Sequence, residues 1–172
     1  MFNDAYNVWS SARTVRLTPW PPGYYDFIVS LPKGSNEALK QAIKKKFGIV
    51  ARRETIETNV FLLVAKNPSA PGLKHSAATS NSMHSSNGEH SSEYAFAFGN
   101  LPELAGFCEG KLGIPVLDRT GNTNKYDIDI KWQWQDKESE KDAFKRAVLD
   151  QLGLELVPSR EPIEMLVVEK AN

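Results

Sequence analysis

A four-residue phrase recurs three times in the sequence and constrains the fold more than any other feature. It reads polar–apolar–Gly–apolar at Lys46–Ile49, Lys111–Ile114 and Gln151–Leu154. Apolar residues at helical spacing precede each phrase, as on one face of an amphipathic helix. A glycine after the last apolar turn is typical of a helix that ends in the left-handed conformation. The sequence therefore predicts three helices, each ending at the glycine of its phrase.

Polar residues suited to begin a helix stand ahead of each of these stretches, at Ser35, Asn100 and Ser139. Asn100 and Ser139 are each followed three residues later by an acidic residue, which is the spacing of a capping box. An earlier helix is indicated by Phe2, Ala5, Tyr6 and Trp9, which also have helical spacing.

Strand patterns bracket the helices. Alternating apolar and polar residues predict half-buried strands at 25–31 and 126–134, and continuous apolar runs predict central strands at 60–65 and 165–168. We expect further strands directly after two of the helices, at 48–55 and 153–158. Two more are expected before and after the middle helix, at 94–98 and 114–117, and a short strand near 14–18.

The two halves of the chain match each other. Tyr25-Asp26 corresponds to Tyr126-Asp127, and Phe47-Gly48 corresponds to Leu152-Gly153. Such self-similarity predicts an internally duplicated architecture. The second half has a strand at 94–98 for which the first half shows no counterpart, so we expect the chain to start inside a repeat unit.

The expected fold class is α+β, built from duplicated β-α-β and β-α-β-β units, with mostly antiparallel sheets and helices packed on one face. The first unit is expected at 1–66, cut short at its start, and the second at 93–172. Residues 67–92 are rich in Ser, Asn, Gly and His without periodicity, and predict a flexible loop between the units.

Metal and catalytic signals are weak. The three histidines, His75, His84 and His90, all fall in the 67–92 segment, and a flexible segment does not supply the fixed geometry of a metal site. We therefore predict no metal and no cofactor. The single cysteine, Cys108, lies among apolar residues at helical spacing and is expected to be buried and inert.

Polar and aromatic residues in the second half are the candidate binding residues. Asp118, Arg119 and Thr120 precede a glycine, and they either form a small polar site or build a turn, which we favour. Trp132 and Trp134 continue the apolar face of their strand and are expected in the core, although Trp134 becomes a platform for a partner if it extends beyond the sheet edge.

Two carboxylates are the candidates for acid–base catalysis. Asp127 and Asp129 share one face of the predicted strand, two residues apart. Paired carboxylates can serve a hydrolase, but a solvated strand face explains them more simply. The sequence carries none of the HExxH, GxSxG, GxGxxG or Walker-type motifs.

Charge and composition exclude several classes. The 172 residues carry 21 basic and 21 acidic side chains, so the net charge is zero, which argues against a nucleic-acid module. No apolar run approaches the roughly 18–20 residues of a membrane span. The first ten residues lack the basic and apolar regions of an export signal, which on its own predicts a cytoplasmic location.

Most of the chain outside 67–92 resembles one protein family. Residues 111–123, followed by Tyr126-Asp127 and Trp132, resemble the signature of the soil-associated bacterial proteins of unknown function. Residues 151–154 with 162–168 look like that family's C-terminus, and residues 47–66 look like its middle. The resemblance implies no catalytic residues. Because members usually carry an export signal, it implies an extracytoplasmic location, periplasmic or secreted.

Together these patterns lead to one expected function. We expect a binding or protein-interaction module without catalytic activity, whose partner is a protein or small-molecule ligand of the cell envelope. The alternative is a hydrolase that uses carboxylates in a cleft between the two halves. A third possibility is a structural domain that oligomerises through an open sheet edge.

Overall fold

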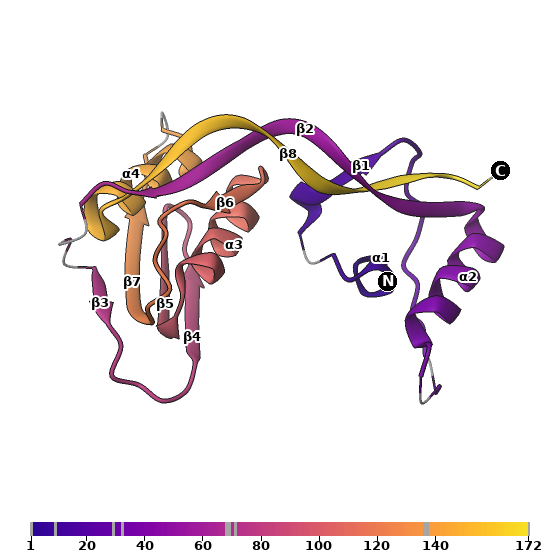
Figure 1. The fold of residues 1–172 in the computed structure, drawn as a ribbon, viewed down its shortest axis with the longest axis horizontal. Helices are drawn as coiled ribbons and strands as arrows, with labels where there is room; N and C mark the ends of the chain where they lie inside the picture. Colours follow the sequence, from indigo (N-terminus) through magenta and orange to yellow (C-terminus); the bar gives the residue numbers. More distant parts are fainter. Residues whose placement is uncertain are drawn as a thin grey trace. The chain divides into compact units, whose positions relative to one another are not determined.

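The computed structural model describes residues 2–8, 10–28, 30–31, 33–67, 70, 72–135 and 138–171. These residues form an α+β fold with four α-helices and two four-stranded sheets, one mixed and one antiparallel (Figure 1). By its contacts the chain divides into unit 1, which is Met1–Thr58 with Arg160–Asn172, and unit 2, which is Asn59–Ser159. These bounds differ from the halves expected at 1–66 and 93–172.

The helices and strands follow one another along the chain as α1 (Phe2–Tyr6), the 3₁₀ turn η1 (Ser11–Arg13), β1 (Thr14–Arg16), α2 (Ser35–Phe47), β2 (Ile49–Ala65), β3 (Leu73–His75), β4 (Ser82–Asn87), β5 (Ser91–Gly99), α3 (Leu101–Leu112), β6 (Val116–Asp118), β7 (Tyr126–Gln133), α4 (Glu140–Leu152) and β8 (Leu154–Lys170).

The three glycine phrases end α2, α3 and α4 as predicted, because each glycine closes its helix in the left-handed conformation. Asn100 forms the predicted capping box with Glu103, through two hydrogen bonds of 2.8 Å. The side chain of Ser139 accepts a hydrogen bond from the backbone of Asp142. The expectation for Ser35 was wrong, since Gly34 holds the cap position and the helix already includes Ser35.

The strands after α2 and α4 are longer than expected. The sequence predicted two separate strands in each place, but β2 and β8 are each continuous over 17 residues. In the mixed sheet the strand order is β1-β8-β2-β6, so both long strands are central, as predicted. The other sheet is antiparallel, as expected, whereas in this one β1 runs parallel to β8 and β6 runs parallel to β2.

The strand predicted at 25–31 is not formed. Its described residues, 25–28 and 30–31, belong to no helix or strand, and Val29 lies outside the described residues. Phe27 is 43% exposed and Leu31 52% exposed, so the apolar alternation is not matched by burial.

The segment 67–92, predicted as a loop without regular structure, contains β3, β4 and the start of β5. β4 is exposed along its whole length and is held by six antiparallel pairs with β5. An edge strand held by backbone hydrogen bonds needs no apolar alternation, so the composition of this segment did not predict β4.

Unit 2 has its core on one face of the antiparallel sheet, whose strand order is β3-β7-β5-β4. Both α3 and α4 pack there against alternate residues of β7, namely Tyr126, Ile128, Ile130 and Trp132. Leu63 of β2, Val116 of β6 and Leu154 of β8 close the same core. In unit 2 the expected packing of helices on one face of a sheet is therefore present.

Unit 1 has a smaller core. Leu39 and Ile43 of α2 pack with Ala5 of α1 and with Leu166 and Val168 of β8. The hydroxyl of Tyr6 accepts a hydrogen bond of 3.0 Å from the backbone of Ala51, which ties α1 to the beginning of β2.

Candidate functional site

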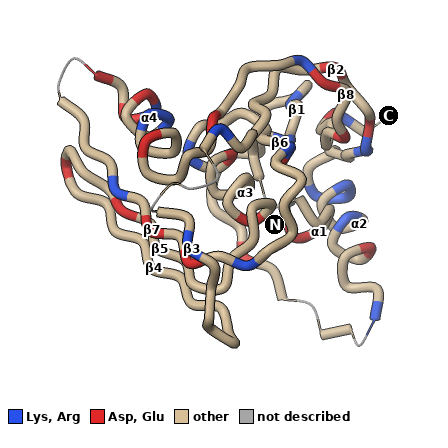
Figure 2. Tube along the Cα trace, turned by 60° about the vertical axis from the view of Figure 1, so that its left-hand side comes forward, with Lys and Arg blue, Asp and Glu red and all other residues tan. Residues whose placement is uncertain are grey.

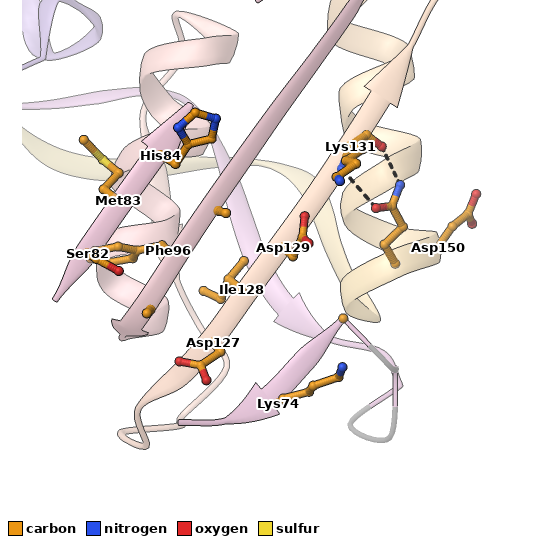
Figure 3. A pocket seen from close by; sticks show the side chains of 14 residues that line it. Lys74, Ser82, Met83, His84, Phe96, Asp127, Ile128, Asp129, Lys131 and Asp150 are labelled. Atoms are coloured by element: carbon orange, nitrogen blue, oxygen red, sulfur yellow. Dashed lines mark hydrogen bonds between the residues drawn. The ribbon is translucent and has the colours of Figure 1, made fainter. Parts of the chain in front are cut away.

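An open hollow of about 820 Å³ lies in unit 2, on the antiparallel sheet and beside the end of α4 (Figure 3). Side chains alternate along β7, so the residues between its buried ones point away from the helices. Asp127, Asp129 and Lys131 are these residues, and all three line the hollow. The same alternation that builds the core therefore places polar groups on the opposite face.

Alanines form the floor of the hollow. Residues paired across an antiparallel sheet share one face, and Ala95 of β5 pairs with Asp129 of β7 on one side and with His84 of β4 on the other. Ala97 likewise pairs with Ser82. Short side chains on the middle strand between longer polar ones on its neighbours leave the sheet face hollowed.

Acidic and basic groups alternate around this floor, and Figure 2 shows both signs on neighbouring strands of the sheet. Glu93 lies between two of the lining side chains, with Oε1 3.2 Å from His84 Nε2 and Oε2 3.5 Å from Lys131 Nζ. The side chains of Asp129 and Lys74 have no hydrogen bond or ion pair within the described part of the chain. The hollow thus offers the carboxylate of Asp129 and the ammonium group of Lys74 to a ligand, and Asp150 of α4 is a further lining carboxylate.

A β-bulge shapes one end of the hollow. The pairing of β5 with β7 shifts between Phe96 and Gly99, and Phe98 takes a left-handed φ of 58°. Asp127 Oδ1 accepts a hydrogen bond of 3.2 Å from the backbone N–H of Phe98. One oxygen of Asp127 is therefore engaged in holding the bulge, whereas Asp129 is not engaged in this way.

At the other side, Gln151 of α4 takes the place of a strand neighbour. The short strand β3 pairs with β7 only as far as Ile128. Beyond it, the Gln151 amide accepts from the N–H of Lys131 at 3.0 Å and donates to its carbonyl at 2.6 Å. This bridge, drawn as dashed lines in Figure 3, secures β7 where the hollow meets α4.

None of the five residues predicted for binding lines this hollow. Asp118 Oδ1 accepts hydrogen bonds from the backbone N–H and the hydroxyl of Thr120, at 2.9 and 2.7 Å. Gly121 follows in a left-handed conformation. The favoured turn is therefore formed, and the backbone N–H of Arg119 donates to the carbonyl of Leu63 at 2.9 Å.

The two tryptophans have different surroundings. Trp132 is buried among Phe107 and Phe144, as expected of a core residue. Trp134 follows the last residue of β7, is half-buried, and packs against the core while its ring meets His90 edge-on. It lines a second, polar hollow with Glu138 and Arg146.

The histidines are dispersed among different partners. His75 stacks on Tyr126 with ring centres 5.0 Å apart, and His84 contacts Glu93. No group of three or more metal-ligating side chains is found among the described residues. Sequence reasoning missed His84 as a lining residue, because only the pairing of β4 with β5 places it beside Ala95.

Cys108 is fully buried on α3, and burial raises the pKa of its thiol to about 12. The thiol is therefore protonated at neutral pH, as the prediction of an inert cysteine requires. Among the described residues, no helix has both the length and the apolar character needed to cross a membrane.

Comparison with known proteins identifies the family. A search of curated proteins and a search of solved structures gave no match to the chain. The family model described as "Protein of unknown function (DUF3738)" matches residues 13–171, which is most of the sequence. The chain therefore belongs to the DUF3738 family of proteins of unknown function.

Proposed function

We propose that this protein is a binding module without catalytic activity, and that its ligand lies in the alanine-floored hollow of unit 2. The observation that carries the proposal is the placement of Ala95 and Ala97 between polar side chains of the flanking strands. The core packs against the opposite face of the sheet, and the face that carries the hollow is open, as ligand sites are.

The lining chemistry favours a ligand that carries both an amino group and a carboxylate, such as a short peptide. Asp129 offers a carboxylate to a cation, and Lys74 offers an ammonium group to an anion. Groups of both signs at one site orient a ligand that carries the complementary pair of charges.

The carboxylate arrangement supports binding over hydrolysis. A pair of carboxylates acts in general acid–base catalysis when both can exchange protons with the substrate. Asp127 accepts a hydrogen bond from the backbone N–H of Phe98 at the bulge, so its carboxylate has a structural role. The other two lining carboxylates, Asp129 and Asp150, lie in an open hollow, a setting suited to pairing with a ligand cation.

We propose that the module acts outside the cytoplasm, on a protein or small molecule of the cell envelope. The support is the family resemblance of residues 111–123 and of the C-terminal strand, since such proteins usually carry an export signal. Fractionation of native cells with an antibody to the protein tests this, and recovery in the cytoplasmic fraction alone would contradict it.

We also propose that the fold arose by internal duplication. The order α1, β1, α2, β2 is repeated as α3, β6, α4, β8. Thr14 of β1 pairs with Leu166 of β8, and Val116 of β6 pairs with Phe61 of β2, with both pairs parallel. Leu166 and Phe61, on the two long strands, are 105 positions apart in the sequence (166 − 61). Val116 and Thr14, on the two short strands, are 102 positions apart (116 − 14). The short strand of each copy thus pairs with nearly the same part of the long strand of the other copy.

Filling the hollow tests the binding proposal. Peptides are selected from a random heptapeptide library on the immobilised wild-type protein, and their affinities are then measured by calorimetry. Ala95→Leu places a larger side chain on the floor of the hollow. Ser86→Leu, the control, makes the same enlargement on β4, which pairs with β5, at a residue that does not line the hollow. We expect Ala95→Leu to weaken binding at least tenfold and Ser86→Leu to change it less than twofold.

Two results would count against this function. Peptide affinities that are the same for Ala95→Leu and the wild type would place binding elsewhere. Turnover in a screen of peptide, ester and glycoside substrates, lost in Asp129→Asn and retained in Ser86→Leu, would replace the binding module with a hydrolase.

A further inference from the structure

Unit 1 has a hollow of its own, of about 550 Å³, at the end of the mixed sheet. Its floor comes from three strands, since Thr18 follows β1, Ile49 begins β2 and Lys170 ends β8. The backbone N–H of Ala171 donates a hydrogen bond of 2.7 Å to the carbonyl of Gly48, which joins the end of β8 to the end of α2. The floor is therefore built from backbone that the sheet and this bond hold in place.

Three aromatic rings form the walls of this hollow. Trp20 and Tyr25 come from the segment that follows β1, and Phe47 is the last residue of α2. The ring of Tyr25 meets that of Phe47 edge-on, with ring centres 4.7 Å apart. Trp20 and Tyr25 are each 37% exposed, so both rings keep surface that a ligand can cover. We call this site the aromatic hollow.

The segment that carries Trp20 and Tyr25 is restrained by its own sequence. Pro21 and Pro22 have fixed φ angles, and a residue before a proline, here Trp20, favours an extended backbone. Gly23 then turns the chain with a positive φ of 95°, which glycine adopts without strain. The hydroxyl of Tyr25 donates a hydrogen bond of 2.7 Å to the carbonyl of Pro22. A wall restrained in this way loses little conformational entropy when a ligand binds.

The charged groups of the aromatic hollow have one sign. Lys46 and Lys170 line it, and none of its described lining residues is acidic. Neither lysine forms an ion pair within the part of the chain that the structure describes. Lys46 Nζ lies 4.9 Å from the ring centre of Tyr25 and 5.7 Å from that of Phe47, where ring faces attract a cation. The hollow therefore places ammonium groups beside aromatic surface, and it favours a negatively charged ligand.

We propose that the aromatic hollow binds a small organic anion with an aromatic ring system, such as an aryl carboxylate or sulfonate. The rings of the ligand pack against Trp20 and Tyr25, and its anionic group pairs with Lys46 and Lys170. A volume of about 550 Å³ falls within the range of about 300–1,000 Å³ that is usual for small-molecule sites. The proposal is independent of the ligand in unit 2, because the two hollows share no lining residue.

Two dyes that differ only in one charged group are the probes. Anilinonaphthalene sulfonate carries aromatic rings and an anionic group, and N-phenylnaphthylamine has the same rings without the sulfonate. Each dye is titrated with the full chain, and binding is followed by the fluorescence of the dye. We expect the sulfonate to bind at least fivefold more tightly than the neutral dye. Added salt should weaken binding of the sulfonate and should not weaken binding of the neutral dye.

Paired variants distinguish the lysines of the aromatic hollow from other lysines. Lys46→Gln combined with Lys170→Gln removes both lining charges. Lys44→Gln combined with Lys45→Gln is the matched control, because it removes the same charge from exposed residues of α2 that do not line the hollow. We expect the first pair to weaken binding of the sulfonate at least fivefold and binding of the neutral dye less than twofold. The control pair should change either affinity less than twofold, and Trp20→Ala should weaken both dyes at least threefold.

Four results would overturn the proposal. The first is absence of binding by the sulfonate, and the second is an equal loss of its affinity in the two lysine pairs. The third is an equal loss of both dyes when Lys46 and Lys170 are replaced, which would mean that these lysines contribute packing and not charge. The fourth is binding of the sulfonate that is lost in Ala95→Leu and retained without the two lysines, which would place the dye in the hollow of unit 2.

Discussion

Two glycines that end helices in unit 2 give a sharp test of the local packing. Gly113 ends α3 with φ of 69° and Gly153 ends α4 with φ of 64°, so both hold the left-handed conformation. Their surroundings differ. A Cβ at Gly113 would meet only Lys141 Nζ at 3.8 Å, whereas a Cβ at Gly153 would lie 2.1 Å from the carbonyl oxygen of Asn67.

These contacts set the expected loss of stability. The left-handed conformation costs an alanine about 1–2 kcal/mol relative to glycine, and this cost applies to both Gly113→Ala and Gly153→Ala. At Gly153 the clash involves backbone that itself bonds to the glycine, since Lys66 and Asn67 donate to its carbonyl at 2.8 and 2.9 Å. Neither side can move independently, and overpacking of this kind adds about 1–3 kcal/mol.

The assay is urea unfolding followed by tryptophan fluorescence, with hydrogen exchange in α3 and α4 as a local measure. With an urea slope of about 1–3 kcal/mol per molar, an extra loss of about 2 kcal/mol moves the midpoint by about 1 M further for Gly153→Ala than for Gly113→Ala. Equal shifts, or a larger shift for Gly113→Ala, would refute the packing at the end of α4.

Three further predictions concern unit 2. Cys108 should resist a disulfide-exchange reagent in the folded protein at pH 8 and react fully in 8 M urea, because burial raises the pKa of its thiol to about 12. Burial also raises the pKa of Tyr94 to about 12. The free energy of unfolding that the neutral side chains of Tyr94 and Cys108 contribute should therefore be intact below pH 9 and fall as the pH rises from about 9 toward 12. Urea midpoints measured from pH 8 to 11 check this, and Cys108→Ala should show a shallower decline. Gln151→Ala removes both hydrogen bonds to the backbone of Lys131. The loss of about 1.4 kcal/mol of local stability should speed amide exchange at Lys131 by roughly tenfold. Gln151→Glu keeps the acceptor and should have a smaller effect.

The helices of this protein could be predicted because their signals are local. The left-handed glycines and the capping box at Asn100 are determined by residues within one or two turns, and the structure contains them. The buried face of β7 was also evident, since Ile128 and Trp132 alternate with polar residues.

The strands differ where pairing decides the structure. β4 has no apolar pattern and exists through its ladder with β5, whereas 25–31 has the pattern of a strand and no ladder among the described residues. β2 is continuous from Ile49 to Ala65 although the boundary between the two units falls within it, and no local signal indicates this continuity.

The hollow depends on cross-strand register, and this explains why its residues were only partly foreseen. Asp127 and Asp129 could be placed on one face from alternation alone. That Ala95 lies between Asp129 and His84 requires the register of three strands, and the sequence paired none of them and did not predict β4. The turn at Asp118 and the core position of Trp132 explain those residues without a ligand.

Amide NMR of the isotope-labelled chain shows whether the hollow is the recognition surface. The spectrum is recorded while the best peptide from the heptapeptide library is added. We predict that saturable shift changes are concentrated at Ser82, His84, Ala95, Asp129 and Lys131, and that they vanish in Ala95→Leu. Saturable changes confined to residues away from these strands, or unaltered in Ala95→Leu, would contradict the claim.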